Sequence, residues 1–360
     1  MTFLSENSTS RSLFRMTESI KFTLIFMLGV ILLAAGLGIW PSFAQEAIVL
    51  VGSGSSVPAP LYDRWATVYN KQNPAVQFRY LPIGASEGIK QISRGSGDFA
   101  AGEVPLTASE RTGASLVELP SVMIAIVLYY HLPGPRQDLR FTGELLSDIF
   151  LGDIKKWNDP QIAKLNPSAS LPDLPIRVYY RPAGKGTNYV FSDFLSKTSS
   201  KFRNRIGTSP SPKWPVGEPA ERSSDMVDKV KGGIGSIGYG ELQYAIKGDI
   251  AYGRVQNATG NFVKASPESI AAACKSVEAP GWDKFAVTLT SSSGADAYPI
   301  TSFTWLYVRT GISDARRASA LKDFLNWIYT DGQQIGEKEG YTELPPQLLA
   351  KVKAKANSLK

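Results

Sequence analysis

One pattern occurs three times in this 360-residue chain: a short apolar run, then a loop of small residues, then a helical pattern. In the first copy, residues 48–51 are all apolar, which is typical of a buried strand, and the Gly/Ser loop 52–56 follows. Leu61, Trp65 and Val68 then recur at helical spacing. The pattern predicts a strand that turns through a tight, small-residue loop into a helix.

The other two copies have the same order. The second has strand-like alternation over 76–81 and a small-residue loop at 84–86, and the third has a strand pattern over 176–180 and a loop at 181–187. Strands that alternate with helices along the chain are typical of layered α/β folds. The fold class we predict is therefore α/β.

These loops also indicate a kind of ligand. The first turn of a helix presents unpaired backbone N–H groups and the positive end of the helix dipole. Glycine, serine and threonine let an anion approach that backbone, and Arg181 opens the third loop. Three such units in one chain predict an anion-binding site.

Composition excludes several kinds of chemistry. The chain has a single histidine, His131, and a single cysteine, Cys274. Zinc sites built from several histidines or cysteines and intramolecular disulfides are therefore excluded, and we expect no metal, cofactor or catalytic residues. Cys274 follows three alanines and is predicted to be a small buried residue. Residues 233–238 match GxGxxG, but the segment before them has a helical pattern, which argues against a dinucleotide site.

The charge is positive but dispersed. There are 39 basic and 32 acidic residues, the formal net charge is +7 and the sequence pI is about 9.2. The two signs alternate along the chain, apart from lysines 351, 353, 355 and 360 in the tail. This pattern indicates a solvated basic surface and no nucleic-acid partner.

The N-terminal segment predicts export. Residues 22–40 are uncharged, and Arg11, Arg15 and Lys21 precede them, which is the layout of a signal peptide. Small residues at the two recognition positions place cleavage after Ala44. The alternative is an uncleaved anchor in the inner membrane, because a run of 19 residues is long enough to span about 30 Å of hydrocarbon.

At the loops the sequence resembles a known family, the periplasmic phosphate-binding proteins of phosphate ABC transporters. The resemblance covers nearly all of residues 48–350, and its segments occur in the family's order. The segments are GSGSSVPAPLYDRWATVYNKQNPAVQFRYLPIGASEGIKQI, DFAAGEVPL, FLGDIKKWNDPQIAKLNP, RPAGKGTNYVFSDFLS, GSIGYGELQYA and AYPITSFTW.

The resemblance implies a type II periplasmic binding protein fold: two α/β lobes with mixed sheets, joined by two hinge strands, with the ligand in the cleft between them. The chain is expected to leave the first lobe near residue 124 and to return near residue 298. The expected parts are a signal peptide or anchor at 1–44, lobe I at 45–124 and 298–360 with the C-terminal helix and basic tail, and lobe II at 125–297.

The function implied is that of the solute-binding component of an ABC importer. Such a protein captures inorganic phosphate or a related oxyanion in the periplasm, closes its lobes by a hinge motion and delivers the anion to the membrane permease. It is not an enzyme, and we expect a monomer. The alternative is a sensor or scaffold protein of the same fold that does not transport and has an altered anion site.

The family's ligand positions carry over residue by residue. Ser56 is expected to donate its hydroxyl and backbone N–H to the anion, and Val57 its N–H. Glu103 stands where the family has the aspartate that accepts the proton of phosphate. The full predicted set is Ser56, Val57, Ser86, Glu103, Arg181, Lys185, Gly186 and Thr187.

Four positions depart from the family pattern. Ala85 replaces a liganding serine and leaves only Ser86, Ala183 replaces an aspartate that orients the arginine, Lys185 replaces a serine, and Glu103 replaces the aspartate. Each lost contact costs about 1–3 kcal/mol if nothing compensates. Lys185 is expected either to contact the anion or to pair with Glu103. The set is more positive than usual, so we predict weaker discrimination against sulfate.

Overall fold

The computed structural model describes residues 46–277 and 287–359 and contains strands and helices in alternation. The strands are β1 (Ile48–Gly54), β2 (Val76–Leu81), β3 (Phe99–Gly102), β4 (Leu116–His131), β5 (Arg140–Phe141), β6 (Arg177–Tyr180), β7 (Glu218–Pro219), β8 (Ser236–Glu241), β9 (Ala251–Tyr252), β10 (Arg254–Gln256), β11 (Phe262–Val263) and β12 (Thr301–Arg309). The helices are α2 (Ala59–Gln72), α3 (Ala85–Ser93), α4 (Ala108–Gly113), α5 (Gly143–Phe150), α6 (Pro160–Leu165), α7 (Gly186–Thr198), α8 (Ser200–Arg205), α9 (Ser223–Gly232), α10 (Leu242–Lys247), α11 (Pro267–Lys275), α12 (Ala315–Ile328), α13 (Asp331–Lys338) and α14 (Pro346–Asn357).

A mixed sheet holds most of the strands together. Over the described residues its order is β2-β1-β3-β12-β4-β8-β6-β7, and β9 pairs with β4. Strand β1 is parallel to β2 and β3, and β6 is parallel to β8, whereas β12 and β4 run antiparallel to their neighbours. A smaller sheet has the order β11-β10-β5. The predicted α/β class is confirmed.

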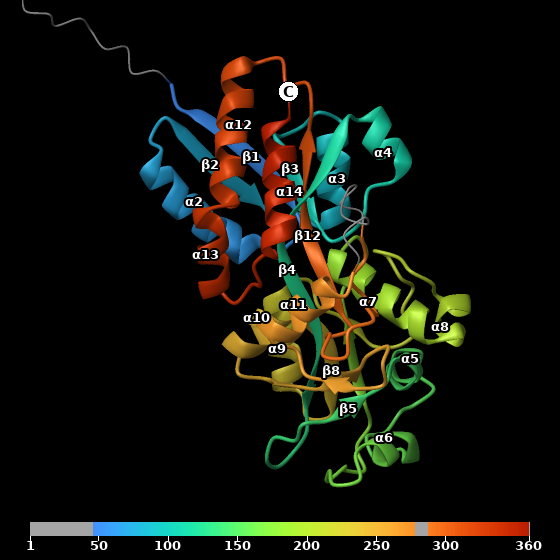
Figure 1. The fold of residues 1–360 in the computed structure, drawn as a ribbon. Helices are drawn as coiled ribbons and strands as arrows, with labels where there is room; N and C mark the ends of the chain where they lie inside the picture. Colours follow the sequence, from blue (N-terminus) through green and yellow to red (C-terminus); the bar gives the residue numbers. More distant parts are fainter. Residues whose placement is uncertain (1–45, 278–286, 360) are drawn as a thin grey trace, which may run out of the picture. The chain divides into compact units, whose positions relative to one another are not determined.

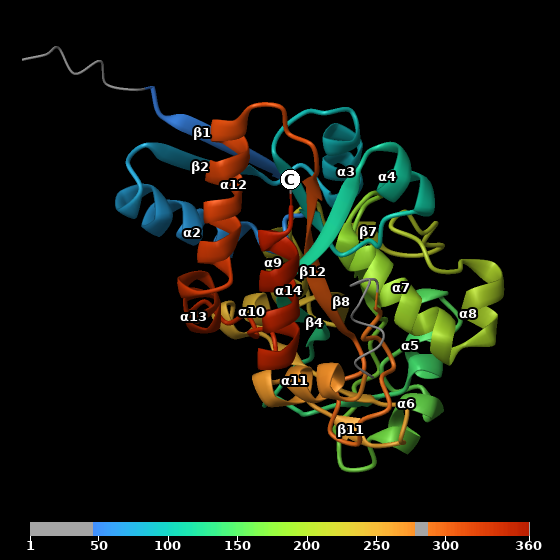
Figure 2. The ribbon, with the colours of Figure 1, turned by 45° about the horizontal axis from the view of Figure 1, so that its top comes forward.

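Strand β4 connects the two ends of this sheet. Its first part, 116–125, pairs with β12, and its last part, 126–131, pairs with β8. In Figures 1 and 2, β4 and β12 run side by side, with β1 to β3 near one end and β8 near the other. The register shifts at Thr304 and Trp305, where Ser121 is the extra residue of a β-bulge.

The three predicted units are confirmed as β1 to α2, β2 to α3, and β6 to α7. The first strand runs to Gly54, so three of the five residues of the predicted first loop belong to the sheet. The reason is pairing with β3, in which residues 52–54 lie opposite residues 99–101. Only glycine fits at position 52, because a Cβ there would lie 2.0 Å from the Phe99 ring. Gly54, with a φ of 139°, then ends the strand.

Two groups of aromatic side chains form much of the core around these units. Stacked and edge-to-face pairs join the rings in each group. The first group is Tyr62, Trp65, Phe78, Tyr80, Phe99 and Phe324, and the second is Phe150, Phe191, Phe202, Trp214 and Tyr239. Tyr62, Tyr80 and Tyr239 also have hydroxyl groups that bond to the loops described below.

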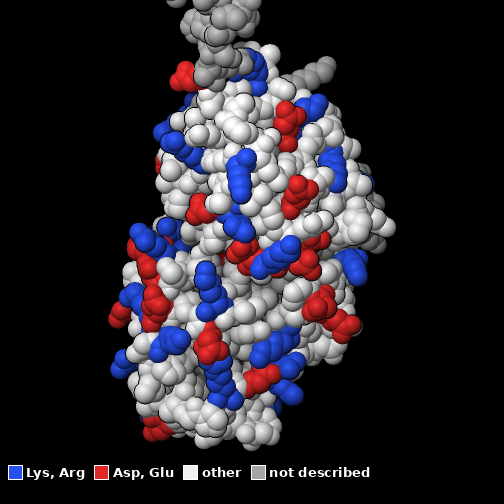
Figure 3. Space-filling view, turned by 90° about the vertical axis from the view of Figure 1, so that its left-hand side faces the viewer, with Lys and Arg blue, Asp and Glu red and all other residues white. Residues whose placement is uncertain are grey.

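Other sequence predictions meet the structure here. Cys274 is buried in α11, as predicted. The GxGxxG match is preceded by helix α9, and strand β8 begins inside it at Ser236, which is the reverse of the order a dinucleotide fold needs. Figure 3 shows one face on which basic and acidic side chains are intermingled.

The predicted signal peptide or anchor, residues 1–44, lies outside the described residues. Among the helices that the structure describes, none has the length and hydropathy to cross a membrane.

Candidate anion-binding site

The three predicted loops lead into helices that lack side-chain caps. The residues at the N-cap positions of α2, α3 and α7 are Pro58, Gly84 and Lys185, and none accepts a hydrogen bond from the helix through its side chain. Other helices are capped at this position: Thr142 accepts from the backbone of α5, and Asp314 from that of α12. The uncapped first turns therefore keep N–H groups for another acceptor.

Arg181 lies at the centre of these loops. Its side chain is 1% exposed, and its Nη1 donates to Ser223 Oγ at 3.0 Å. Nη2 donates to Ser56 Oγ at 3.3 Å and to the Glu221 carbonyl at 3.0 Å, while Nε has no partner within the described residues. No described carboxylate lies within ion-pair distance of this guanidinium. A buried cation without a counterion is costly, and an anion is the partner that would offset the cost.

The arginine loop is held by an amide and a phenol. Asn188 Nδ2 donates to the carbonyls of Arg181 at 3.0 Å and Pro182 at 2.7 Å. The Tyr239 hydroxyl donates to Asn188 Oδ1 and accepts from the Arg181 backbone N–H. These contacts fix the direction in which the arginine leaves β6. Neither Asn188 nor Tyr239 was among the predicted site residues.

Glu103 directly follows β3 and is fully buried. Its Oε1 accepts from Thr304 Oγ1 at 3.0 Å, and the Ser55 hydroxyl also bonds to its carboxyl group. Oε2 has no partner in the part of the chain that the structure describes. Oε2 faces the start of α7, because a Cβ at Gly186 would lie only 1.8 Å from it. Burial raises the pKa of Glu103 to about 8, although the bonds from Ser55 and Thr304 lower it in part.

The bulge in β4 positions the hydroxyl that bonds Glu103. Ser121 Oγ donates to the carbonyl of Thr304 at 2.8 Å and lies 2.9 Å from the Tyr62 hydroxyl. Gln333 Nε2 in turn donates to the carbonyl of Ser121 at 2.8 Å. A chain of buried hydrogen bonds therefore runs from α13 through the bulge to the acid of the site.

Thr187 has a partner that the sequence did not indicate. Its hydroxyl donates to Oε1 of Glu241 at 2.8 Å, and Glu241 is fully buried at the end of β8. Oε2 of Glu241 has no partner among the described residues. Because the threonine hydroxyl is engaged here, its first-turn backbone N–H is the donor that remains for an anion.

Lys185 does not pair with Glu103, which corrects one of the two expected alternatives. Its Nζ lies 4.0 Å from Oε2 of Glu221, and its side chain is 19% exposed. Burial and, after it, the neighbouring charge of Arg181 lower the pKa of Lys185. The lysine therefore adds positive charge beside Arg181, partly balanced by an exposed glutamate.

The remaining predicted residues are close by but differ in availability. The Ser86 N–H donates to the carbonyl of Gly184 at 3.2 Å, which joins the second loop to the third. The Val57 N–H donates to Ser55 Oγ at 3.2 Å, so it is engaged within its own loop. Ala85 is fully buried, and because alanine has no hydroxyl, this position provides no side-chain donor.

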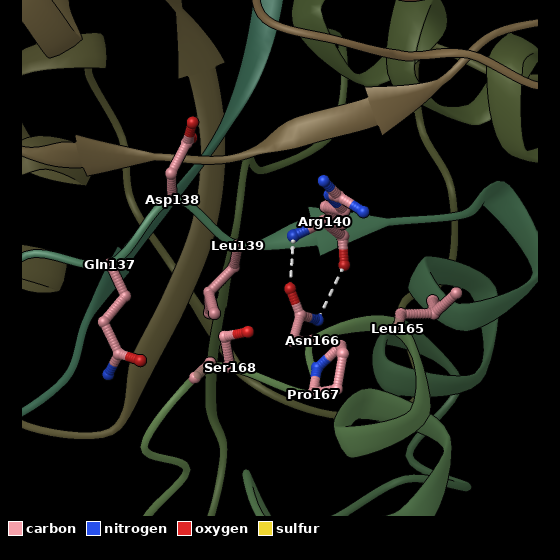
Figure 4. Close-up of a pocket in the computed structure, with 9 residues that line it drawn as sticks. Gln137, Asp138, Leu139, Arg140, Leu165, Asn166, Pro167 and Ser168 are labelled. Atoms are coloured by element: carbon pink, nitrogen blue, oxygen red, sulfur yellow. Dashed lines mark hydrogen bonds between the residues drawn. The ribbon is translucent and has the colours of Figure 1, made fainter.

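A separate pocket of about 310 Å³ lies by β5 and the end of α6. Figure 4 shows Asn166 there, with its side-chain amide paired to both backbone groups of Arg140, at 2.7 Å and 3.1 Å. None of the predicted anion ligands lines this pocket. No group of acidic, histidine or cysteine side chains that could hold a metal occurs among the described residues.

Several residues that complete the site were missed in the sequence. Some accept hydrogen bonds from Arg181, some support the arginine loop, and the others bond to Glu103 or to Thr187. The set is Glu221, Ser223, Asn188, Tyr239, Thr304 and Glu241. A signal existed for Ser223 alone, since it begins a helix after a polar loop, but the same pattern is typical of an ordinary N-cap.

Comparison with known proteins identifies the class first. A protein-family model described as "PBP superfamily domain" matches residues 41–332 of this chain. The structure is similar to a phosphate-bound high-affinity periplasmic phosphate-binding protein, PfluDING, with a TM-score of 0.69 at 19% identity over 85% of this chain and 93% of that one. The fold is that of the type II periplasmic binding proteins.

Sequence relatives then identify the family. The chain is 36% identical to the phosphate-binding protein PstS of Xylella fastidiosa strain 9a5c, over 87% of this chain and 86% of that protein. It is 33% identical to the phosphate-binding protein PstS of Pasteurella multocida, over 87% and 91% of the two chains. The chain therefore belongs to the PstS family of phosphate-binding proteins within the PBP superfamily.

Proposed function

We propose that this protein is the solute-binding component of an ABC importer, which captures inorganic phosphate in the periplasm and delivers it to a membrane permease. The observation that carries the proposal is Arg181, a cation at 1% exposure whose side-chain acceptors are all neutral. Three uncapped helix starts surround it. Such a site is built to receive an oxyanion by backbone N–H groups, hydroxyls and one guanidinium.

Glu103 determines which oxyanion fits best. When its carboxyl is protonated, Oε2 can donate to any anion oxygen, and when it is ionised, Oε2 can only accept. Hydrogen phosphate retains a proton to donate to an ionised carboxylate, whereas sulfate has none. The raised pKa of about 8 implies that the carboxyl is largely neutral at physiological pH, which weakens discrimination against sulfate there.

Calorimetric titration with phosphate, arsenate and sulfate at about pH 6 and about pH 9 tests both points. We expect phosphate to bind at either pH and sulfate to lose more affinity than phosphate at the higher pH, because ionised Glu103 repels it. Arg181→Ala should weaken phosphate binding about a hundred-fold or more, since it removes the buried charge. No binding of any oxyanion would reject the proposal, and phosphate preferred a thousand-fold at about pH 6 would reject weak discrimination.

The proposed function also implies that the chain is divided into two lobes. Residues 45–124 and 298–360 form lobe I, and residues 125–297 form lobe II, with β4 and β12 as the hinge strands. The pairing of β4, first with β12 over 116–125 and then with β8 over 126–131, supports this division. The contacts from Arg181 to Ser56 and from Ser86 to Gly184 then cross from one lobe to the other. An anion held at this junction favours the closed arrangement.

We also propose that residues 1–44 are a signal peptide that is removed on export. N-terminal sequencing of protein recovered from the periplasm should give Gln45 as the first residue. Recovery of the intact N-terminus in the membrane fraction would favour the anchored form. The sensor or scaffold alternative needs no tight anion site, so weak phosphate binding by the wild type that Arg181→Ala leaves unchanged would favour it.

A further inference from the structure

A fourth helix start faces the same arginine. Helix α9 begins at Ser223, which is 2% exposed, and the residue before it, Arg222, provides no side-chain cap to the helix. The sequence places this segment about 40 residues beyond the third loop, and it belongs to none of the three repeated units. In the structure its first hydroxyl is the acceptor of Arg181 Nη1 at 3.0 Å.

The hydroxyl of Ser223 has bonding capacity left over. A serine hydroxyl accepts through its lone pairs and donates through one hydrogen. Ser223 Oγ accepts from Arg181, and no described residue receives its hydrogen. The guanidinium that Ser223 contacts also has an unpartnered donor, since Nε of Arg181 is buried and has no acceptor among the described residues. The serine and the arginine that bonds to it therefore each retain one buried donor.

The start of α9 also orients Arg181, which in the family is the role of an aspartate that this chain lacks. The family's aspartate that would orient Arg181 is Ala183 in this chain, and Ala183 is exposed. The guanidinium is oriented instead by Ser223 Oγ, by the carbonyl of Glu221 and by Ser56. All three acceptors are neutral, so the full charge of Arg181 remains available to an anion.

We propose that Ser223, with the N-terminus of α9, is a fourth ligand element of the anion site: its oxygen positions Arg181 and its hydroxyl hydrogen bonds the bound oxyanion. The proposal rests on the proposed function. Like Ser56, which also accepts from Arg181, Ser223 would act on the arginine and on the anion through one hydroxyl, but it lies outside the three predicted loops.

Phosphate titration of the purified full-length protein, wild type and variants, tests it. We expect Ser223→Ala to weaken phosphate binding about ten- to hundred-fold, because two hydrogen bonds of a charged group are lost. Ser223→Thr should keep most of the affinity, since it keeps the hydroxyl. Ser224→Ala is the matched control: Ser224 is the next residue, exposed, and bonds only to Asp225, so wild-type affinity is expected.

A second measurement separates a ligand from a purely structural residue. At a fixed phosphate concentration, the stabilisation by phosphate grows with the logarithm of its affinity, so tighter binding gives a larger increase in melting temperature. A ligand role predicts a smaller phosphate-induced increase in Ser223→Ala, whereas a structural role predicts a lower unliganded melting temperature with the increase unchanged. Wild-type affinity or an unchanged increase in Ser223→Ala would overturn the proposal. If wild-type protein itself bound no phosphate, the proposed function would fail instead.

Discussion

The buried guanidinium of Arg181 has only neutral hydrogen-bond partners, so its burial is energetically costly. Removing an ion from water costs several kcal/mol, which hydrogen bonds to Ser56, Ser223 and the Glu221 carbonyl offset only in part. An incoming oxyanion is the partner that completes the compensation. The nearby carboxyl of Glu103 shows the opposite response, because burial favours its neutral form.

Glu103 gives a pH prediction for stability. Its pKa is about 8 in the folded protein against 4.5 as the ordinary value, so between these values the folded state holds a proton that the unfolded chain has released. Stability from this group is therefore fully present below about pH 4.5 and is lost as the pH rises to about 8.

Glu103→Gln removes this titration. We expect urea unfolding in phosphate-free buffer to give equal stabilities near pH 4.5 and a variant that is more stable above pH 8, by no more than about 5 kcal/mol. Glu144→Gln, at an exposed position of α5, is the control. A constant difference between variant and wild type across the range would contradict the prediction.

At the scale of the elements, the helices differ in whether a side chain caps their first turn. Helices α5, α6, α8 and α11 have Thr142, Asp159, Ser199 and Ser266 at the N-cap, and each accepts a bond from the helix backbone. Helices α2, α3, α7 and α9 have no such bond, so each lacks about 1 kcal/mol of stability that a cap would provide. Helices α10, α13 and α14 also begin without a side-chain cap, so a missing cap does not by itself mark the site. At α2, α3, α7 and α9 the uncapped first turns leave N–H groups that a bound anion can use.

Gly186 tests the role of the α7 start. An alanine Cβ there would lie 1.8 Å from Glu103 Oε2, so either the carboxyl or the helix must move. We expect Gly186→Ala to weaken phosphate binding at least ten-fold in a titration, because the helix N–H groups and the acid no longer face one anion. Gly113→Ala is the control, since nothing lies within 4 Å of its Cβ position. Unchanged affinity in Gly186→Ala would show that the anion does not bind against this turn.

At the scale of the whole molecule, strand β4 makes the site possible. Its 16 residues pair with β12 and then with β8, so the loops after β1 and β6 meet although about 125 residues separate Ser56 from Arg181. Two hydrogen bonds that join these loops directly are Arg181 to Ser56 and Ser86 to Gly184. A ligand that bridges them should therefore change the arrangement of the chain as a whole.

Scattering should detect that change. We expect saturating phosphate to reduce the radius of gyration in small-angle X-ray scattering, as the lobes close on the anion. At a hundred times its Kd, phosphate should also add about 2.7 kcal/mol to the free energy of unfolding. Arg181→Ala at the same phosphate concentration should show both effects much reduced, with no more than about 0.4 kcal/mol of added stability. An identical radius with and without phosphate in the wild type would argue against closure by the ligand.

Much of the fold was predictable because it depends on local patterns. The units at 48–56, 76–86 and 176–187 combine apolar periodicity with small-residue loops, and these signals act over a few residues. The position of Arg181 at the start of a loop was equally visible. Less predictable was the end of β1, where pairing with β3 extends the strand to Gly54.

The sequence alone determined the α/β class, the three strand-loop-helix units and an arginine poised for an anion, because each rests on residues adjacent in the chain. Only the tertiary structure decided which partners each group has. Lys185 lies near Glu221 and not Glu103, Thr187 bonds Glu241, and Ser223 replaces an acid absent at Ala183. The physical reason is that a buried polar group takes whatever complement the folded chain brings within about 3 Å, and that neighbour is set by sheet order and packing.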